Sequence, residues 1–502
     1  MKSTDTGLKN QVKKAAAWGY FGLLGRIVIQ LGSQVALARL VGPEEYGAFA
    51  VGAIVVGVAN FVADGGIGAA IVQRKITNRD ELEFISTLQV ITGAATFAVI
   101  WIASPILAAL FNANSKAVEI IRLLGLVCLA TSLGSVSQNI LRKNLDFRRI
   151  QISQLVGMTI GYIVVGLPIA YLGGGVWSLG LAWVAQSIAT TALLFNYTRP
   201  PVGIRFWCDN GRAIAWFGVS ALVSNLSTWL GTGVDKMVVG FRYSPLQLST
   251  YNVASNLIYT AASQLLSTAQ QLIFSFSAKD AENRSEELKK MANLLIETGV
   301  LIFFPFMICI AISAEVIVLT LYGSSWIDAA NVLSPAALTM AFYGISGLLT
   351  PLLWSTGSVS SDAKMQFVGV LLVGTAASIA ATQKDPSAVA WAVLPCVALK
   401  TIWTIRMVKQ SMQLKTRTIV RSFYGGGMAS IILGAIFGGA IQLTRTLDMA
   451  IYQQAIIVVL LMLIILPIVI ATSVFIAGTR ELKDILEPLF ERGKVFLREV
   501  RG

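Results

Sequence analysis

Ala36-Leu-Ala-Arg-Leu-Val-Gly-Pro-Glu-Glu-Tyr-Gly-Ala-Phe-Ala-Val-Gly52 is the stretch of sequence that decides the fold. Apolar residues lead up to Gly42-Pro43, a pair that ends a helix, and a second apolar run begins at Gly47. Between them, Glu44, Glu45 and Tyr46 predict a short polar turn. The stretch therefore predicts a helical hairpin.

The same pattern returns 202 positions later, in the segment from Val238 to Ala254. Pro245 stands in the place of Pro43, and Tyr251 in the place of Phe49. In both copies a long apolar run follows and ends in a polar loop, at residues 78–82 and 283–288. The repeat predicts that the second half of the chain is a duplicate of the first.

Composition places the chain in a membrane. Of its 502 residues, 55% are hydrophobic and only 13% are charged, and the mean hydropathy is +0.71. This leaves too little polar surface to cover a soluble globule of that size. The net charge of +13 is compatible with nucleic-acid binding. However, the basic residues occur in short clusters between apolar runs, which indicates membrane orientation, so no nucleic-acid partner is expected.

Residue usage also argues against enzymatic chemistry. The absence of histidine excludes the usual zinc sites and Ser-His or Cys-His catalysis. The four cysteines include no Cys-x-x-Cys pair, so free thiols are expected. No predicted loop exceeds about 20 residues, which leaves no room for a soluble catalytic domain. The chain is therefore expected to act between its helices, not to be an enzyme, and to need no cofactor or metal.

Apolar runs long enough to cross a bilayer predict about fourteen transmembrane helices, since a core about 30 Å thick needs roughly 20 residues per helix. The predicted spans are 15–40, 46–72, 84–111, 117–140, 150–172, 176–196, 213–240, 246–276, 292–321, 329–354, 364–382, 387–405, 418–443 and 452–477.

The basic residues between these runs predict the orientation. With the N-terminus in the cytoplasm, 30 of the 39 lysines and arginines fall in cytoplasmic segments, and 6 fall in external loops and adjoining helix ends. This bias follows the positive-inside rule. Both termini are therefore expected in the cytoplasm, and the tail at 479–502 is expected to form an amphipathic helix at the membrane surface.

Three basic residues lie inside predicted spans, where a charge costs at least about 2.5 kcal/mol unless it faces a cavity or a partner. They are Arg26, Lys236 and Lys400. One interpretation is a cationic cavity that binds the diphosphate of an anionic head group. The other is a structural ion pair or, for Lys400, a side chain that reaches the membrane surface.

Acidic residues inside spans are candidates for neutralisation or coupling. Asp64 precedes Gly65-Gly66, which allow close helix packing or an unwound segment. It is a candidate to neutralise Arg26, to cap a broken helix or to bind a coupling cation. Asp235 directly precedes Lys236, so the two side chains point about 100° apart on a helix. Glu297 is expected to be a solvated residue near the cytoplasmic boundary.

Uncharged polar residues crowd the first, seventh and eighth spans. Such residues mark helices that face water or sugar hydroxyls, whereas the fourteenth span is almost purely aliphatic. A polar cavity is therefore expected between early helices of each half. The candidates for its lining are Gln30, Gln34, Asn225 and Asn256.

Several motifs together resemble one family of exporters. They are the run from Leu40 to Gly47, the segment from Asp64 to Arg74, Leu141-Arg142 with Phe147-Arg148, Gly175-Val-Trp-Ser-Leu179 and Asp235-Lys236. The chain is similar to the polysaccharide transporter (Wzx-type flippase) branch of the multidrug/oligosaccharidyl-lipid/polysaccharide (MOP) exporter superfamily. It departs from this pattern at Ser249, where the second hairpin would usually have glycine.

This resemblance implies an all-α membrane protein of the MATE/MurJ kind with two six-helix bundles and two extra helices. The bundles would span 1–200 and 213–410, joined by a cytoplasmic linker at 201–212, with the extra helices at 411–478.

The resemblance also implies a substrate. An undecaprenyl-diphosphate-linked oligosaccharide would cross the bacterial inner membrane by alternating access for exopolysaccharide or lipopolysaccharide biosynthesis. By similarity, Arg26 and Lys236 would bind its diphosphate. A polysaccharide polymerase and chain-length or export proteins would be partners.

Two other functions stay open. A cation-coupled multidrug exporter of the same superfamily would favour carboxylates and aromatic residues in its cavity. A membrane glycosyltransferase or polymerase would need an acidic pair on a long external loop, and the external loops here are short.

Overall fold

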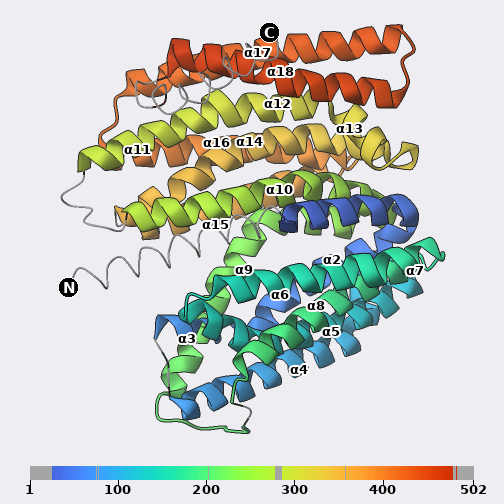
Figure 1. Cartoon of the computed structure of the whole chain (residues 1–502), viewed down its shortest axis with the longest axis vertical. Coiled ribbons are helices and arrows are strands. Elements are labelled where there is room, and N and C mark those ends of the chain that lie inside the picture. Colours follow the sequence, from blue (N-terminus) through green and yellow to red (C-terminus); the bar gives the residue numbers. More distant parts are fainter. Residues whose placement is uncertain are drawn as a thin grey trace, which may run out of the picture. The chain divides into compact units, whose positions relative to one another are not determined.

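The computed structural model describes residues 25–74, 76, 78–201, 203–277, 285–356, 358–478 and 482. These residues form helices and connecting turns without any strand, which confirms the predicted all-α class (Figure 1). Contacts divide the chain into two compact units, Met1–Asn252 and Val253–Gly502. The predicted tail helix and the start of the first span lie outside the described residues.

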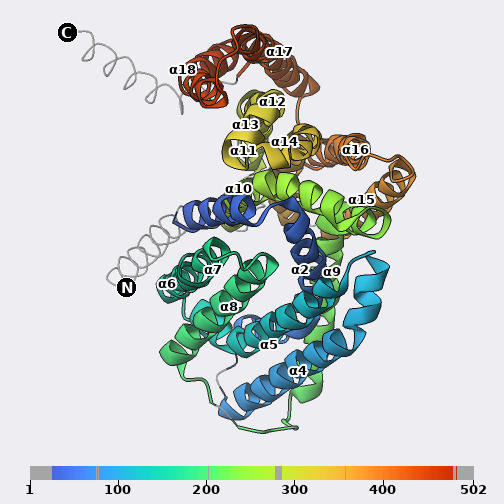
Figure 2. The same ribbon diagram turned by 90° about the vertical axis from the view of Figure 1, so that its right-hand side faces the viewer.

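Unit 1 begins with a helix over residues 25–41 and ends with the first residues of α10. Figure 2 shows α8 packed beside α5, with α6 and α7 against α8. Between these ends the unit contains α2 (Pro43–Asp64), α3 (Ala69–Gln73), α4 (Arg79–Leu110), α5 (Ser115–Lys143), α6 (Phe147–Met158), the π-helix η1 (Thr159–Gly166), α7 (Leu167–Tyr171), α8 (Val176–Thr198) and α9 (Gly211–Arg242).

Unit 2 contains most of α10 (Pro245–Ser277) and the remaining helices. Its last two long helices, α17 and α18, pack against each other and against α12. The helices that follow α10 are α11 (Ser285–Thr298), η2 (Gly299–Phe303), α12 (Phe304–Ile312), α13 (Ala314–Leu321), η3 (Ser324–Trp326), α14 (Asp328–Ser355), α15 (Val359–Ala380), α16 (Ser387–Met412), α17 (Thr416–Thr446) and α18 (Ile451–Ala477).

Among the described residues, 11 helices are long and apolar enough to cross a membrane, and the chain is a multi-pass membrane protein. The helix over 25–41, α9 and α10 overlap three further predicted spans but are not among those 11. The count of fourteen therefore stays a prediction. The predicted ninth span, 292–321, is interrupted at Ser313, which separates α12 from α13.

The hairpin predicted at Gly42-Pro43 is present. Gly42 has a φ of +78°, which glycine adopts without strain, and Pro43 occupies the first turn of α2. The predicted polar turn is wrong, however, because Glu44, Glu45 and Tyr46 already belong to α2. Acidic side chains are favourable in the first turn of a helix, so the helix starts at the proline.

Glu45 joins the beginnings of three helices of unit 1. Its carboxylate accepts a hydrogen bond from Lys116 Nζ of α5 at 2.5 Å. It also accepts one from the backbone N–H of Val176, at the start of α8, at 3.4 Å. The first copy of the repeat therefore anchors one end of the helix bundle.

The second hairpin begins differently but contacts the first. Ser244 and Gln247 form a reciprocal cap at the start of α10, with side-chain to backbone distances of 3.2 and 3.3 Å. Ser249 Oγ donates to the carbonyl oxygen of Pro43 at 2.7 Å. A Cβ added to Gly47 would lie 2.6 Å from the carbonyl atoms of Pro245. The two copies of the motif thus pack against each other.

The second predicted span, 46–72, is broken after Asp64. Gly65 and Gly66 have φ values of +56° and +63°, and α3 starts a few residues later. Gly66 also lies against α9, because an added Cβ would come within 2.5 Å of Ala221 Cβ. The unwound segment was one of two interpretations of this motif, and the structure contains it.

The linker at 201–212 is attached to the start of α4. The Arg205 guanidinium contacts Asp80 at 2.9 Å and Glu83 at 3.4 Å. Its backbone N–H donates to Thr87 Oγ1 at 2.9 Å, and Asn210 Nδ2 donates to Glu81 at 2.6 Å. These contacts attach the segment before α9 to unit 1.

Candidate functional site

Arg26 is held by a neutral partner inside unit 1. Its Nη1 donates to Gln154 Oε1 of α6 at 2.9 Å, and its Nε is buried without a hydrogen-bond partner. In the part of the chain that the structure describes, no carboxylate pairs with Arg26. No described residue therefore neutralises its positive charge, which argues against a structural ion pair.

Two predicted cavity residues share the helix over 25–41 with Arg26. Gln30 and Gln34 follow it at intervals of four residues, so all three side chains lie along one face. Each is partly buried. This face combines one cation with two amide groups, which can donate and accept hydrogen bonds with phosphate and sugar oxygens.

Sequence reasoning missed Gln154. It lies 128 residues after Arg26, and this separation carries no local signal. The available hint was the polar group Gln151, Ser153 and Gln154 at the beginning of the fifth span. Gln151 Oε1 is also buried without a hydrogen-bond partner among the described residues.

Asp235 and Lys236 follow each other on α9, and Asp235 contacts α10. Both residues are partly buried. The Asp235 carboxylate accepts a hydrogen bond from the Tyr251 hydroxyl at 2.7 Å. Because the Tyr251 side chain is 2% exposed, this bond fixes Asp235 against α10. Asp235 therefore has a structural role in this contact, which the sequence did not predict when it marked Asp235 as a candidate for ion coupling.

Asp64 lies at the break between α2 and α3, where α4 and α5 supply polar side chains. Its carboxylate accepts a hydrogen bond from Ser135 Oγ at 2.6 Å, and its backbone carbonyl accepts one from Gln89 Nε2 at 2.8 Å. The carbonyl of Ala63 accepts hydrogen bonds from Thr92 and Ser132. These side chains satisfy carbonyls that the end of a helix leaves unpaired.

The surroundings of Asp64 exclude one of its three candidate roles in this conformation. Its carboxylate pairs with Ser135, whereas Arg26 pairs with Gln154, so Asp64 does not neutralise Arg26. Within the described residues, Asp64 forms no ion pair. A charge inside a membrane span is costly without compensation, so a role for Asp64 in binding a proton or another cation stays a hypothesis.

Lys400 belongs to unit 2. Its Nζ donates to Gln366 Oε1 of α15 at 2.6 Å and lies 5.6 Å from the centre of the Tyr343 ring of α14. Near the start of α15, Asp362 is 4% exposed and accepts a hydrogen bond from Trp354 Nε1 at 3.0 Å. Lys400 is therefore part of a polar cluster between α14, α15 and α16.

The remaining candidates differ in exposure. Asn225 is exposed on α9, and Asn256 is partly buried on α10. Glu297, which was expected to be solvated, is 1% exposed, so that expectation is wrong. The helix that contains it packs against α14 and α17, and this packing covers the side chain.

Comparison with solved structures shows the fold. The chain matches the lipid II flippase MurJ in an inward closed conformation with a TM-score of 0.70, at 13% identity over 95% of this chain and 99% of that one. An inward-facing multidrug-resistance MATE transporter of the MOP superfamily gives 0.57, at 14% identity over 78% and 94%. The predicted MATE/MurJ-like fold is therefore confirmed.

Curated relatives match over about two thirds of the chain. The teichuronic acid biosynthesis protein TuaB of Bacillus subtilis (strain 168) is 23% identical over 359 residues, which cover 70% of this chain and 71% of TuaB. The succinoglycan biosynthesis transport protein ExoT of Rhizobium meliloti (strain 1021) is 25% identical over 356 residues, or 69% of each chain. The resemblance to polysaccharide transporters is thus confirmed.

A family model described as "Polysaccharide biosynthesis protein" matches residues 36–331. The match starts with the first hairpin and extends beyond the second, so it contains both copies of the repeat. Because it covers more than half of the 502 residues, the chain belongs to this family of polysaccharide biosynthesis proteins.

Proposed function

We propose that this protein moves undecaprenyl-diphosphate-linked oligosaccharide repeat units across the inner membrane by alternating access. The product would be used for exopolysaccharide or lipopolysaccharide biosynthesis. Membership of the polysaccharide biosynthesis family, a relative named as a succinoglycan transport protein and the fold of a lipid II flippase support this function. A sugar head group does not cross hydrocarbon unaided, and two repeats that move around a polar cavity provide a path.

The observation that carries the proposal is the unneutralised charge of Arg26. A guanidinium donates several hydrogen bonds in a planar arrangement that suits phosphate oxygens. Gln154 orients this group without cancelling its charge. Arg26 therefore retains the electrostatic attraction that a diphosphate needs, and Gln30 and Gln34 continue the same face with groups that bind hydroxyls.

Further residues receive proposed roles on this basis. Lys236 provides a second cation for the diphosphate, and Lys400 a cation in unit 2 with Gln366 as its neighbour. Asn225 and Asn256 are proposed to contact sugar hydroxyls. Asp64 and Asp235 are the candidates for coupling transport to a cation, with Asp235 bound to Tyr251 in this conformation.

The proposal includes the organisation and placement of the chain. Two six-helix bundles at 1–200 and 213–410 are joined by the linker at 201–212 and followed by two further helices at 411–478. Both termini lie in the cytoplasm. The protein acts without catalysis and meets a polysaccharide polymerase and chain-length or export proteins.

A multidrug exporter is the second candidate, because MATE transporters share the fold. Such proteins would need a cavity suited to cationic drugs. The in-span basic residues Arg26, Lys236 and Lys400 favour an anionic substrate instead. The glycosyltransferase alternative predicts a soluble catalytic segment, and the connections between the described helices are short.

Accumulation of substrate tests the proposal. Loss of the protein should leave lipid-linked repeat units in the cytoplasmic leaflet, measured by extraction and by an enzyme that modifies only accessible head groups. Restored export after re-expression is the control. If repeat units still reach the outer leaflet at the normal rate without the protein, the flippase function is wrong.

A further inference from the structure

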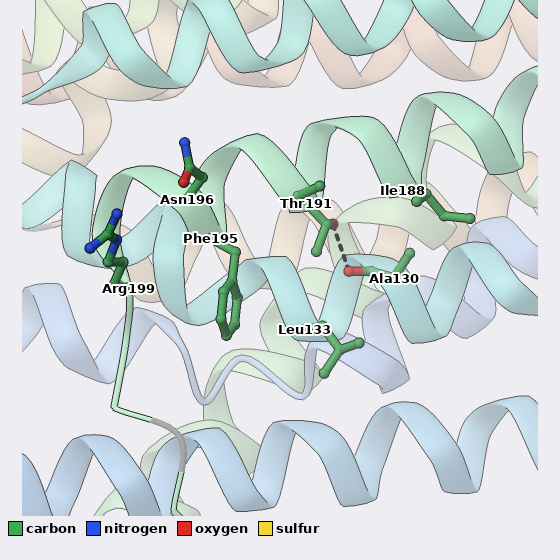
Figure 3. Close-up of a pocket in the computed structure, with 8 residues that line it drawn as sticks. Ala130, Leu133, Ile188, Thr191, Phe195, Asn196 and Arg199 are labelled. Carbon is green, nitrogen blue, oxygen red and sulfur yellow. Dashed lines mark hydrogen bonds between the residues drawn. The ribbon is translucent and has the colours of Figure 1, made fainter.

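A groove of about 610 Å³ lies between α5 and α8 of unit 1 (Figure 3). Asn196 and Arg199 lie toward one end of the groove, and Ile188 lies toward the other. The Thr191 hydroxyl donates to the Ala130 carbonyl at 2.8 Å, so this polar group is satisfied. The groove is therefore mainly apolar between its ends. Its lining residues are Ala130, Leu133, Ile188, Thr191, Ala192, Phe195, Asn196 and Arg199.

The groove opens on the side of α8 that faces away from α2. On the opposite side of α8, the Trp183 ring contacts Phe49 of α2 with ring centroids 6.0 Å apart. Since a helix turns about 100° per residue, Ala192 lies roughly 180° around the axis from Trp183. Leu133 and Ile188 are 37% and 54% exposed. Exposed apolar side chains of membrane-spanning helices face lipid chains, so the groove is open to lipid.

Arg199 ends α8 in a conformation that usually belongs to glycine. Its φ is +41°, and its backbone N–H donates to the Phe195 carbonyl. This conformation is unfavourable for an L-residue with a side chain, but a cation is favourable at the C-terminal end of a helix. In the described part of the chain, the Arg199 guanidinium forms no ion pair or hydrogen bond. It is therefore available to an anion at the end of the groove.

Whereas the first groove lies between two helices, a second groove in unit 2 is lined by residues of α16 alone. Its volume is about 350 Å³, and it contains Arg406 beside exposed Leu399 and Trp403. The lining positions on α8 and on α16 follow the same spacing of i, i+3, i+4, i+7, i+8 and i+11. α8 and α16 contain the sixth and twelfth predicted spans, and the arginine stands at i+11 in the first groove and at i+7 in the second.

We propose that each groove binds an anionic phospholipid of the surrounding membrane. One acyl chain lies along Leu133, Ile188 and Phe195, while the phosphate accepts hydrogen bonds from Arg199 and from the Asn196 amide. A single guanidinium balances the single negative charge of a phosphodiester, whereas a diphosphate needs more cations. The groove therefore suits a phosphatidylglycerol-type lipid better than the lipid-linked oligosaccharide, and this assignment is independent of the proposed transport function.

Native mass spectrometry of the purified full-length protein tests the assignment. The protein is titrated with phosphatidylglycerol and with phosphatidylcholine of the same acyl chains. The wild type should retain two tightly bound phosphatidylglycerol molecules, at least tenfold more tightly than phosphatidylcholine. Arg199→Gln should retain one, and the double variant with Arg406→Gln should retain none. Arg242→Gln removes the same charge from the end of α9 and should retain two.

Filling the groove tests the position of the acyl chain. Ala192→Trp places a large side chain between the groove walls and should remove one tightly bound lipid without any change of charge. Thermal unfolding shows whether each variant is folded. If Ala192→Trp does not fold, the arginine variants still test the site.

Four results would overturn the assignment. They are equal retention of the two lipids by the wild type, two bound lipids in folded Arg199→Gln, an equal loss in Arg242→Gln, and displacement of phosphatidylglycerol by undecaprenyl phosphate at equimolar concentration. The last result would assign the groove to the chain of the transported lipid.

Discussion

Ser249 Oγ donates a hydrogen bond to the carbonyl oxygen of Pro43, 206 residues earlier in the chain, at 2.7 Å. In the reciprocal contact, Gly47 of the first copy lies against the backbone of Pro245 in the second. The repeat makes Pro43 equivalent to Pro245 and Gly47 equivalent to Ser249, so each copy contacts its counterpart through equivalent positions. Such reciprocity is the mark of a two-fold contact. The serine that stands in place of the expected glycine in the second copy donates this hydrogen bond.

The contact predicts that Gly47→Ala destabilises the protein. A Cβ at this position would lie 2.6 Å from backbone atoms of Pro245, which cannot move aside as a side chain can. We expect a loss of about 1–3 kcal/mol, the usual cost of overpacking, measured as a lower midpoint of thermal unfolding. Gly32→Ala is the control, because a Cβ there meets nothing within 4 Å. An unchanged midpoint in Gly47→Ala would contradict the contact.

The broken helix predicts a cost for removing Gln89. Gln89 is 1% exposed and donates to the Asp64 carbonyl at 2.8 Å. Leucine cannot donate, so Gln89→Leu should leave this carbonyl without its partner and cost about 1–3 kcal/mol. Gln73→Leu on the exposed surface of α3 makes the same chemical change and should cost little. Equal unfolding midpoints for the two variants would show that the hydrogen bond does not matter.

The linker contacts predict a change in protease sensitivity. Arg205 contacts two carboxylates of α4 while Phe206 and Trp207 beside it are 70% and 79% exposed. Arg205→Ala should therefore release the segment and accelerate chymotrypsin cleavage at these aromatic residues several-fold. Exposed ion pairs contribute little to the free energy of unfolding, so the global stability should change little. Arg199→Ala, which breaks no ion pair, should leave the cleavage rate unchanged.

The orientation predicts which side of the membrane the linker faces. Asp209→Cys provides an exposed thiol when it is introduced into a variant without native cysteines. A membrane-impermeant maleimide should label it only after the membrane is permeabilised. If the Asp209→Cys variant is labelled in intact cells, the linker lies outside the cell and the predicted topology is wrong.

The reactivity of the neighbouring native cysteine is a separate prediction. Native Cys208 is 8% exposed, and burial raises the pKa of its thiol. Fewer thiolates then form at neutral pH, so Cys208 in the wild type should react more slowly than the thiol introduced by Asp209→Cys and speed up as the pH rises.

Local sequence signals predicted the parts of the fold that depend on neighbouring residues. Gly42-Pro43 predicted the first hairpin, and a break in the second span was one of the two interpretations of Asp64-Gly-Gly, because both features depend on glycine and proline conformations. The error at Glu44–Tyr46 was also local, since proline favours the first turn of a helix as well as a turn. Contacts between distant residues, such as Arg26 with Gln154, depend on how the helices pack and carry no signal in one sequence.

The last prediction concerns the charge of Arg26, on which the proposed function rests. Gln154→Glu would replace the neutral acceptor at 2.9 Å by a carboxylate of nearly the same shape. The new ion pair should neutralise Arg26 without loss of packing, and it should abolish export while the amount of protein in the membrane stays normal. Arg26→Ala should have the same effect, because both variants remove the free cation. Gln154→Ala removes the hydrogen bond but keeps the charge, so it should reduce export only partly. If Gln154→Glu exports repeat units as well as Gln154→Ala does, the charge of Arg26 does not bind the substrate, and the cationic site has to lie elsewhere.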